Sequence, residues 1–274
     1  MGIAALYSLH DWVHQPWLAW GLAPYLCYVM GYLIPVAFWE VIIRQSCARS
    51  CMLAYGKDAV DGGRASALQK IQAQPGLAWS AQLWGALGML FGPTSLLNAG
   101  AAAILLPLFV PPPDVTVQCW TQLVLQVVAL ELVGDFGLYV GHRIQHEIPF
   151  LWKNYHKHHH KVLTPTPVTT LFIHPVDATL QGGLPIMGAA VMVRPHPMAF
   201  WVYVWLRIAE NVTNHSGLSG RLVEVLTFKM LPLRCSIAHH DSHHRFSNHS
   251  GSAKNYGENF WIWDWMFGTL RPLN

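Results

Sequence analysis

Long apolar stretches alternate with short polar ones along the chain, and several are long enough to cross a membrane as a helix, which takes about 20 residues. The first runs from Trp17 to Ile43, the second from Leu77 to Val110, and the third from about Gln118 to Val140. Gly92-Pro93 interrupts the second stretch, and a Pro-Pro-Pro-Asp turn at 111–114 separates it from the third. The pattern predicts three spanning helices, the second of them kinked.

A fourth apolar region, from Leu184 to Ile208, is divided by the sequence Arg-Pro-His-Pro at 194–197. Each half is too short to span a membrane by itself. We expect a helical hairpin that dips into the membrane and returns to the same side.

Basic residues follow the first and third apolar stretches, at Arg44, Arg49, Lys57, Arg64 and Lys70, and at Arg143, Lys153 and Lys157. Cytoplasmic loops of membrane proteins carry an excess of lysine and arginine. Residues 44–70, 142–182 and 211–274 are therefore expected on the cytoplasmic face, with the proline turn on the opposite side.

Composition supports a membrane protein and excludes other classes. Of the 274 residues 53% are hydrophobic and 11% charged, against about 25% charged in soluble domains. A net charge of +3 without a basic cluster among aromatic residues argues against a nucleic-acid partner. The five cysteines form no CxxC pair, so neither a disulfide framework nor a thiolate metal site is indicated.

Sixteen histidines are present, and most of those in the polar stretches recur at regular spacings. The spaced motifs are HxxxH at His142 and His146, HxxHH at His156, His159 and His160, and HxxHH again at His240, His243 and His244. Two single positions, His174 in "IHPVD" and His215 in "NHSG", complete the set. His10, His14, His196 and His249 have no partner at such a spacing, and His158 faces away from its neighbours on a helix.

These spacings suit a metal site with two ions. Residues at i, i+3 and i+4 share one helix face, whereas adjacent residues differ by about 100° in azimuth. Each HH pair can therefore reach two metals a few Å apart. Few carboxylates accompany the histidines, so neutral imidazoles would dominate the site, and imidazole suits iron, zinc and copper.

Longer segments around these histidines resemble the fatty acid hydroxylase / sterol desaturase superfamily of membrane di-iron enzymes. The similar segments are "DFGLYVGHRIQH", "HKHHHKVLTPTPVTTLFIHPVD", "HHDSHH" and the tail "NYGENFWIWDWMFGTLR". Together they span about residues 131–271.

The resemblance implies an all-α, integral-membrane helical bundle with a cytosolic helical cap that carries a histidine-rich dinuclear metal site. Residues 1–117 would form an N-terminal transmembrane region and residues 118–274 a catalytic domain of this type. Two irons, or zinc as a substitute in purified protein, would be held by His142, His146, His156, His159, His160, His174, His215, His240, His243 and His244. Four further residues are candidates for a ligand or for a partner of the ligands: His239, Asp241, Asp135 and Asn255.

The resemblance also implies an oxygen-dependent hydroxylation or desaturation of a sterol or related lipid, at the endoplasmic reticulum. Electrons would come from NAD(P)H through an external reductase and cytochrome b5. "HSG" and "HHDxHH" favour C-4 methylsterol oxidases and sterol side-chain hydroxylases, whereas "PTP" and "HPVD" favour C-5 desaturases. Asn211 stands where fatty acid 2-hydroxylases have a histidine, which disfavours that activity.

Two rival interpretations remain at this level. A histidine-rich metal transporter or sensor is one, although a transporter places its ligands within the spans and these clusters lie outside them. Metal-assisted hydrolysis is the other, although the chain has no HExxH motif.

Overall fold

The computed structural model describes residues 15–44, 72–74, 76–110, 119–251 and 253–272. Within these ranges the chain is helical, and its β-structure is limited to isolated bridges, one of which joins Arg234 and Phe260. The predicted all-α fold class is confirmed. The basic loop at 45–70, the proline turn, the proposed domain boundary at 117/118, His10 and His14 lie outside the described residues.

Four helical stretches of the described chain are long and apolar enough to cross a membrane. The first is Trp17–Ile43, formed by a π-helical turn η1 (Trp17–Leu22) and α2 (Ala23–Ile43). The second is Trp79–Phe109, formed by α5 (Trp79–Phe91) and α6 (Pro93–Phe109), and the third is α7 (Trp120–Glu147). The first two coincide with the spans expected from the sequence, whereas α7 continues seven residues beyond the expected end at Val140 and carries His142 and His146, so this pair is not outside the helix of the span as expected.

The expected kink in the second span is found at Gly92-Pro93, between α5 and α6. A Cβ atom at Gly92 would lie 2.0 Å from the carbonyl oxygen of Gly88, so only glycine fits this close approach. Pro93 has no N–H to continue the hydrogen-bonding pattern of α5, and it is well suited to the first turn of a new helix.

The fourth stretch corrects the expectation that both halves of the hairpin are too short. Its first half begins at Pro175 and runs through α9 (Pro175–Ala178), η5 (Thr179–Gly183) and α10 (Leu184–Val193), which makes it 19 residues long. Polar Gln181 and two glycines hide this extension from the hydropathy pattern. The chain then turns at Arg194, where φ is +52°, into α11 (Pro197–Asn214).

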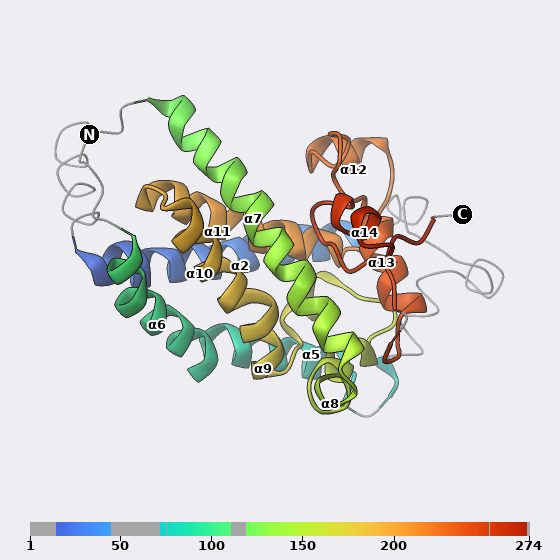
Figure 1. The fold of residues 1–274 in the computed structure, drawn as a ribbon. Coiled ribbons are helices and arrows are strands. Elements are labelled where there is room, and N and C mark those ends of the chain that lie inside the picture. The colour runs from blue at the N-terminus through green and yellow to red at the C-terminus, as the bar shows by residue number, and fades with distance from the viewer. Residues whose placement is uncertain (1–14, 45–71, 75, 111–118, 252, 273–274) are drawn as a thin grey trace.

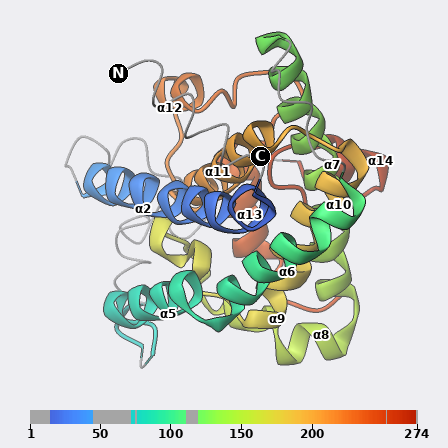
Figure 2. The same cartoon turned by 90° about the vertical axis from the view of Figure 1, so that its left-hand side faces the viewer.

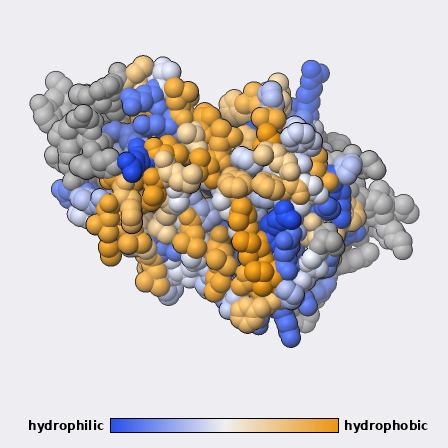
Figure 3. Space-filling model, in the orientation of Figure 1, coloured by the Kyte–Doolittle hydropathy of each residue, from blue (hydrophilic) through white to orange (hydrophobic). Residues whose placement is uncertain are grey.

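α11 packs against two of the spanning helices, α2 and α7 (Figures 1 and 2). Glycines allow these close approaches: a Cβ at Gly31 of α2 would lie 2.3 Å from Ile208, and one at Gly134 of α7 would lie 1.9 Å from the Tyr203 hydroxyl. Apolar atoms cover much of the outer face of these helices (Figure 3).

The shorter elements gather at one end of the bundle, at the right of Figure 1, where α7 and α11 both end. They are α8 (Pro149–Asn154), the 3₁₀ helices η3 (His156–Lys161) and η4 (Pro167–Leu171), α12 (Arg221–Leu226), α13 (Ile237–Phe246) and α14 (Ile262–Met266). Almost all the histidines singled out above lie here.

Candidate metal centre

Nine buried imidazoles from four helical elements converge at this end of the bundle. They form two groups, and within each group the ligand nitrogens lie within 4.8 Å of one another. The first group consists of His142, His146, His156, His160 and His243, and the second of His159, His215, His240 and His244. α7 supplies the first two of these residues, η3 three, α13 three, and the end of α11 supplies His215.

Each adjacent HH pair contributes one ring to each group, which is how the two groups come to adjoin. His160 belongs to the first group and His159 to the second, and His243 and His244 divide in the same way. The rings of His160 and His244 stack across the boundary, with centroids 4.8 Å apart. The first HxxHH motif is a 3₁₀ turn rather than an α-helix, so its three rings fan out more widely than α-helical spacing predicts.

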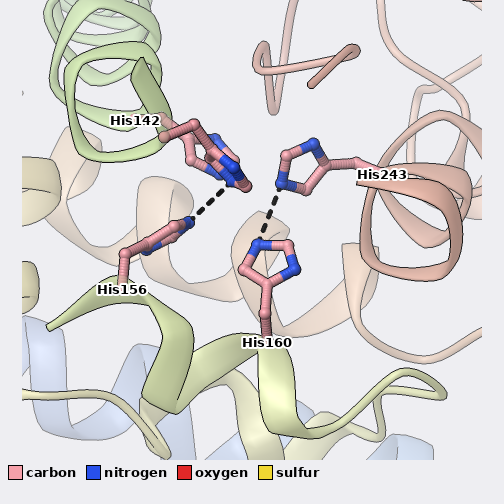
Figure 4. A group of neighbouring side chains, drawn as sticks. His142, His156, His160 and His243 are labelled. Atoms are coloured by element: carbon pink, nitrogen blue, oxygen red, sulfur yellow. Dashed lines mark hydrogen bonds between the residues drawn. The ribbon is translucent and has the colours of Figure 1, made fainter. Parts of the chain in front are cut away.

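The rings of the first group point their Nε2 atoms toward a common centre (Figure 4). The Nε2 atoms of His146 and His156 are 3.0 Å apart, and those of His160 and His243 are 3.1 Å apart. Buried His142 Nε2 has no hydrogen-bond partner at all.

The outward-facing Nδ1 atoms of the first group are held by acceptors. His142 Nδ1 donates to the carbonyl of Tyr256, His146 Nδ1 to that of His249, and His243 Nδ1 to that of Lys254. His156 Nδ1 donates to the Asp177 carboxylate at 2.9 Å. Because a carbonyl or carboxylate oxygen can only accept, each of these imidazoles carries its proton on Nδ1 and turns an Nε2 lone pair inward.

The contact between His146 and His156 tests whether a metal fits. A neutral imidazole carries one proton, and in both rings Nδ1 donates it to an oxygen, so a pair of neutral rings has no proton for the 3.0 Å contact between their Nε2 atoms. Two lone pairs that face each other in a buried site repel unless a cation lies between them. Acceptors behind histidine ligands are the usual support of protein metal sites, and the residues present therefore fit a metal ion.

The second group shows the same kind of Nδ1 support at two of its four rings, His215 and His244. His215 Nδ1 donates to the Asn211 carbonyl, and its Nε2 lies 3.3 Å from the Nε2 atoms of both His159 and His240. His244 Nδ1 lies 3.2 Å from the Val162 carbonyl, and its buried Nε2 has no partner.

Burial favours the neutral form of imidazole, which is the form that binds metals. Desolvation, followed by the neighbouring rings, lowers the pKa of His159, His160, His240 and His244 well below the ordinary 6.5. Desolvation also lowers the pKa of His243, to about 3.

The remaining sequence candidates lie outside both groups. His174 accepts a hydrogen bond from the Val176 amide at the start of α9, and its ring packs on Tyr155. His239 contacts the Asp264 carboxylate at 3.0 Å, and Asp241 is buried without joining either group.

Asp135 and Asn255 organise the C-terminal segment rather than the histidine rings. Asp135 accepts the backbone N–H groups of Asn259 and Phe260, which ties this segment to α7. Asn255 donates to Ser242 and accepts from the Arg271 amide. Asn255 has a φ of +60°, a conformation that asparagine tolerates better than most residues.

Two carboxylates that were not predicted from the sequence as site residues, Asp177 and Asp264, support the site. Asp177 orients His156, although 21 residues separate them, and Asp264 accepts from the Tyr256 and Gly257 amides that border the first group. Both residues fall in the motifs "HPVD" and "WDW" quoted above, so the motifs were the available signal. Their partners become visible only in the folded chain.

A cavity of about 170 Å³ runs from the spanning helices to the second group. His159 and His215 line its inner part, together with Arg207, Asn211 and Glu258. Arg207 donates to Glu258 at 2.8 Å, so the buried charges of this pair are matched. The rest of the wall is mostly apolar and comes from η1, α2, α6, α10 and α11, including Trp20, Tyr28, Ala102, Met187 and Phe200.

These features are those of a membrane protein with two adjoining histidine groups that are able to hold metal ions, one of them at the end of an apolar cavity. The chain belongs to the fatty acid hydroxylase family, whose model matches residues 127–269, slightly more than half of the chain. The resemblance inferred from the histidine motifs is confirmed.

The relatives that this chain matches are named for different reactions. The chain is 33% identical over 150 residues to methylsterol monooxygenase 2-2 of Arabidopsis thaliana, which covers 55% of this chain and 54% of the relative. It is 36% identical over 151 residues to very-long-chain aldehyde decarbonylase GL1-11 of Oryza sativa subsp. indica, with 55% and 54% covered.

A third relative is the Delta(7)-sterol-C5(6)-desaturase of Nicotiana tabacum, 31% identical over 156 residues, which cover 56% of this chain and 52% of the relative. The chain thus spans about half the length of the relatives it matches. No solved structure matches it.

Proposed function

We propose that this protein is a membrane-bound, oxygen-dependent lipid oxidase that uses two iron ions, one in each histidine group. The observation that carries the proposal is the buried convergence of nine imidazoles, with the Nε2 atoms of His146 and His156 facing each other at 3.0 Å. When bound and reduced, a pair of irons supplies the activation of O₂ needed to oxidise an unactivated C–H bond.

The dimensions of the groups suit this assignment. A metal–imidazole bond is about 2.0–2.1 Å, so nitrogens on opposite sides of one ion lie about 4.2 Å apart. The nitrogens of each group already lie within 4.8 Å of one another, so a small contraction would complete either site. Imidazole is a suitable ligand for iron, and no thiolate is present in either group.

The protein's own residues would hold, orient and shield the reacting groups. Backbone carbonyls and Asp177 fix the ring angles, so the Nε2 atoms stay aimed inward without a metal. Full burial of rings such as His146, His160 and His244 excludes bulk water from both groups. Water exclusion limits competing reactions, which is the usual contribution of the protein in cofactor chemistry.

The cavity would hold the lipid. Because His159 and His215 line it, the second group would face the substrate and the first group would lie behind it. An apolar wall with a few polar groups at one end is the usual character of a lipid or small-molecule site. Arg207, Asn211 and Glu258 supply that polar end.

Other parts of the system follow from the family. Electrons would come from NAD(P)H through a separate reductase and cytochrome b5, and the protein would work in the endoplasmic reticulum with its histidine end toward the cytosol. The relatives' names include a methylsterol monooxygenase and a sterol desaturase, which supports a sterol or related lipid as substrate and either hydroxylation or desaturation as the reaction.

The test is oxidation of lipid by the purified, iron-loaded full chain in nanodiscs, with a chemical reductant and ¹⁸O₂. Mass spectrometry of an added sterol and fatty-lipid mixture should show a product that contains ¹⁸O or lacks two hydrogens. His240→Ala should abolish this product, whereas His174→Ala, outside both groups, should preserve it. If the protein binds metal but consumes no O₂ with any lipid mixture, the proposal is contradicted and a non-enzymatic metal protein is favoured.

A further inference from the structure

Residues 221–233, which we call the α12 segment, expose apolar side chains and bury a lysine, whereas a loop that faces water does the opposite. Seven large apolar side chains point outward: Leu222, Val225, Leu226, Phe228, Met230, Leu231 and Leu233. Lys229, between two of them, is only 5% exposed, whereas Phe228 and Met230 are 67% and 62% exposed. Water around this segment would favour the opposite arrangement, because lysine is among the residues least often buried.

The segment is firmly held at its base, so this arrangement is part of the fold. Lys229 donates through Nζ to the carbonyl of Cys235, and Arg234 pairs with Glu210 of α11. Val223, on the inner side of α12, packs against the core formed by α2, α5 and α11. The backbone takes positive φ at Phe228 (+55°) and Leu233 (+68°), a conformation that large side chains rarely adopt.

The exposed apolar surface continues from the α12 segment toward the membrane-spanning part of α7. The Trp261 amide donates to the Leu233 carbonyl, which joins the segment to the strip before α14. Trp265, Met266 and Phe267 at the end of α14 are exposed. The Phe136 ring of α7 contacts the Trp263 ring at a centroid distance of 4.9 Å and the Phe267 ring at 6.2 Å.

α7 is one of the candidate membrane spans, and its outward face is apolar from Val124 through Phe136 to Ile144. The α12 segment, α14 and this face therefore form one connected surface, visible as orange and tan atoms over α12 and α7 in Figure 3. An apolar surface of this extent on a protein marks a contact with a membrane or another protein. Continuity with a face that already meets lipid favours the membrane.

We propose that the α12 segment and the exposed end of α14 lie in the interface of the membrane that the chain spans, as a collar beside α7. Tryptophan and other aromatic side chains are enriched at this depth, and an apolar face on a short helix buries there without crossing. His142 follows Phe136 by six residues, or about 9 Å along the helix. The collar would thus set the histidine end directly above the membrane surface, independently of which reaction the site performs.

Site-directed spin labelling in nanodiscs that hold one copy of the chain tests this placement. Single cysteines would replace Leu226, Met230 or Trp265 in a background where Cys27, Cys47, Cys51 and Cys119 are serine, while buried Cys235 is kept. Lys153→Cys on α8 is the water-exposed control, and Leu125→Cys on α7 is the lipid-facing control. Unchanged iron content of each variant would show that the fold is retained.

The readout is the ratio of collision rates with O₂, which concentrates in lipid, and with a water-soluble nickel complex. We expect the ratio at positions 226, 230 and 265 to exceed that at 153 several-fold and to approach that at 125. A ratio equal to that at 153 would place the collar in water and overturn the proposal. Shielding from both reagents would also overturn it, because protein rather than lipid would then cover the segment.

Discussion

At the scale of single residues, the site depends on where each imidazole keeps its proton. Four of the five rings in the first group direct Nδ1 at an oxygen, three of them at backbone carbonyls and one at Asp177. These bonds hold the lone pairs inward before any metal arrives. The carboxylate is the strongest of these acceptors, because it raises the basicity of the ligand as well as orienting it.

Asp177→Asn should therefore weaken metal binding in the first group. Loss of such a supporting acceptor usually lowers metal affinity by about 10–100-fold. Competition with a chelator measures the change, and Glu147→Gln, at an exposed carboxylate of α7, is the matched control. Equal affinities for Asp177→Asn and the wild type would show that Asp177 does not support the site.

The metal-free fold should lose stability in acid. Burial lowers the pKa of His243 from 6.5 to about 3, so between these values the unfolded chain binds a proton that the folded chain does not. Stability is then fully present above pH 6.5 and falls with decreasing pH, by up to about 1.4 kcal/mol per pH unit for each such group. Thermal unfolding of metal-free protein in detergent at pH 8, 6.5 and 5 measures this. An unfolding temperature that rises as the pH is lowered would contradict the assignment of neutral, buried rings.

At the scale of elements, the site depends on how closely α7 approaches the helix that carries Asp177. A Cβ at Gly141, next to His142, would lie 2.4 Å from the Leu180 carbonyl of η5. Backbone cannot move aside as the end of a flexible side chain can. The contact between α7 and η5 therefore fixes the distance between His142 on α7 and Asp177, the residue on the other helix that orients His156.

Gly141→Ala should separate these elements and reduce both stability and metal content. Overpacking of this kind costs about 1–3 kcal/mol. Gly188→Ala in α10 is the matched control, because nothing lies within 4 Å of the added Cβ and alanine favours a helix by about 1 kcal/mol. The unfolding temperature and the iron content should both fall for Gly141→Ala. For Gly188→Ala the unfolding temperature should stay the same or rise, and the iron content should not fall. Equal behaviour would refute the close-packing argument.

The sequence predicted the elements better than their extent. Hydropathy located three spans and the kink at Gly92-Pro93, because apolar length and glycine-proline pairs are local properties. It missed that helix continues from Pro175 into α10, because Asp177 is polar to support the distant His156 and Gln181 lines the cavity. The HxxxH and HxxHH spacings drew attention to eight of the nine rings that converge, and "NHSG" to the ninth, His215. No spacing shows that carbonyls of Tyr256 and Lys254 orient these rings, since every residue has a carbonyl.

At the scale of the whole molecule, the histidine groups, α13, α14 and the basic residues beyond α7 all lie at one end of the bundle. This end is expected in the cytosol by the positive-inside rule. Three N-glycosylation sequons lie here, at Asn211, Asn214 and Asn248. Asn214 is buried and donates to the Glu258 carbonyl, whereas Asn248 is exposed.

Asn248 is therefore the informative sequon for orientation, and it should carry no glycan when the chain is expressed in eukaryotic cells. A sequon introduced between residues 111 and 118, expected on the opposite side, is the positive control. Sensitivity of the electrophoretic mobility to glycosidase reports both. A glycan on Asn248 would reverse the orientation.

The central claim is that two adjoining histidine groups each hold one metal ion. Anomalous scattering at the iron absorption edge, from crystals of the iron-loaded full chain, tests it most directly. The account predicts two peaks, one among His142, His146, His156, His160 and His243, and the other among His159, His215, His240 and His244. A single peak, or peaks outside these groups in a fully loaded sample, would contradict it.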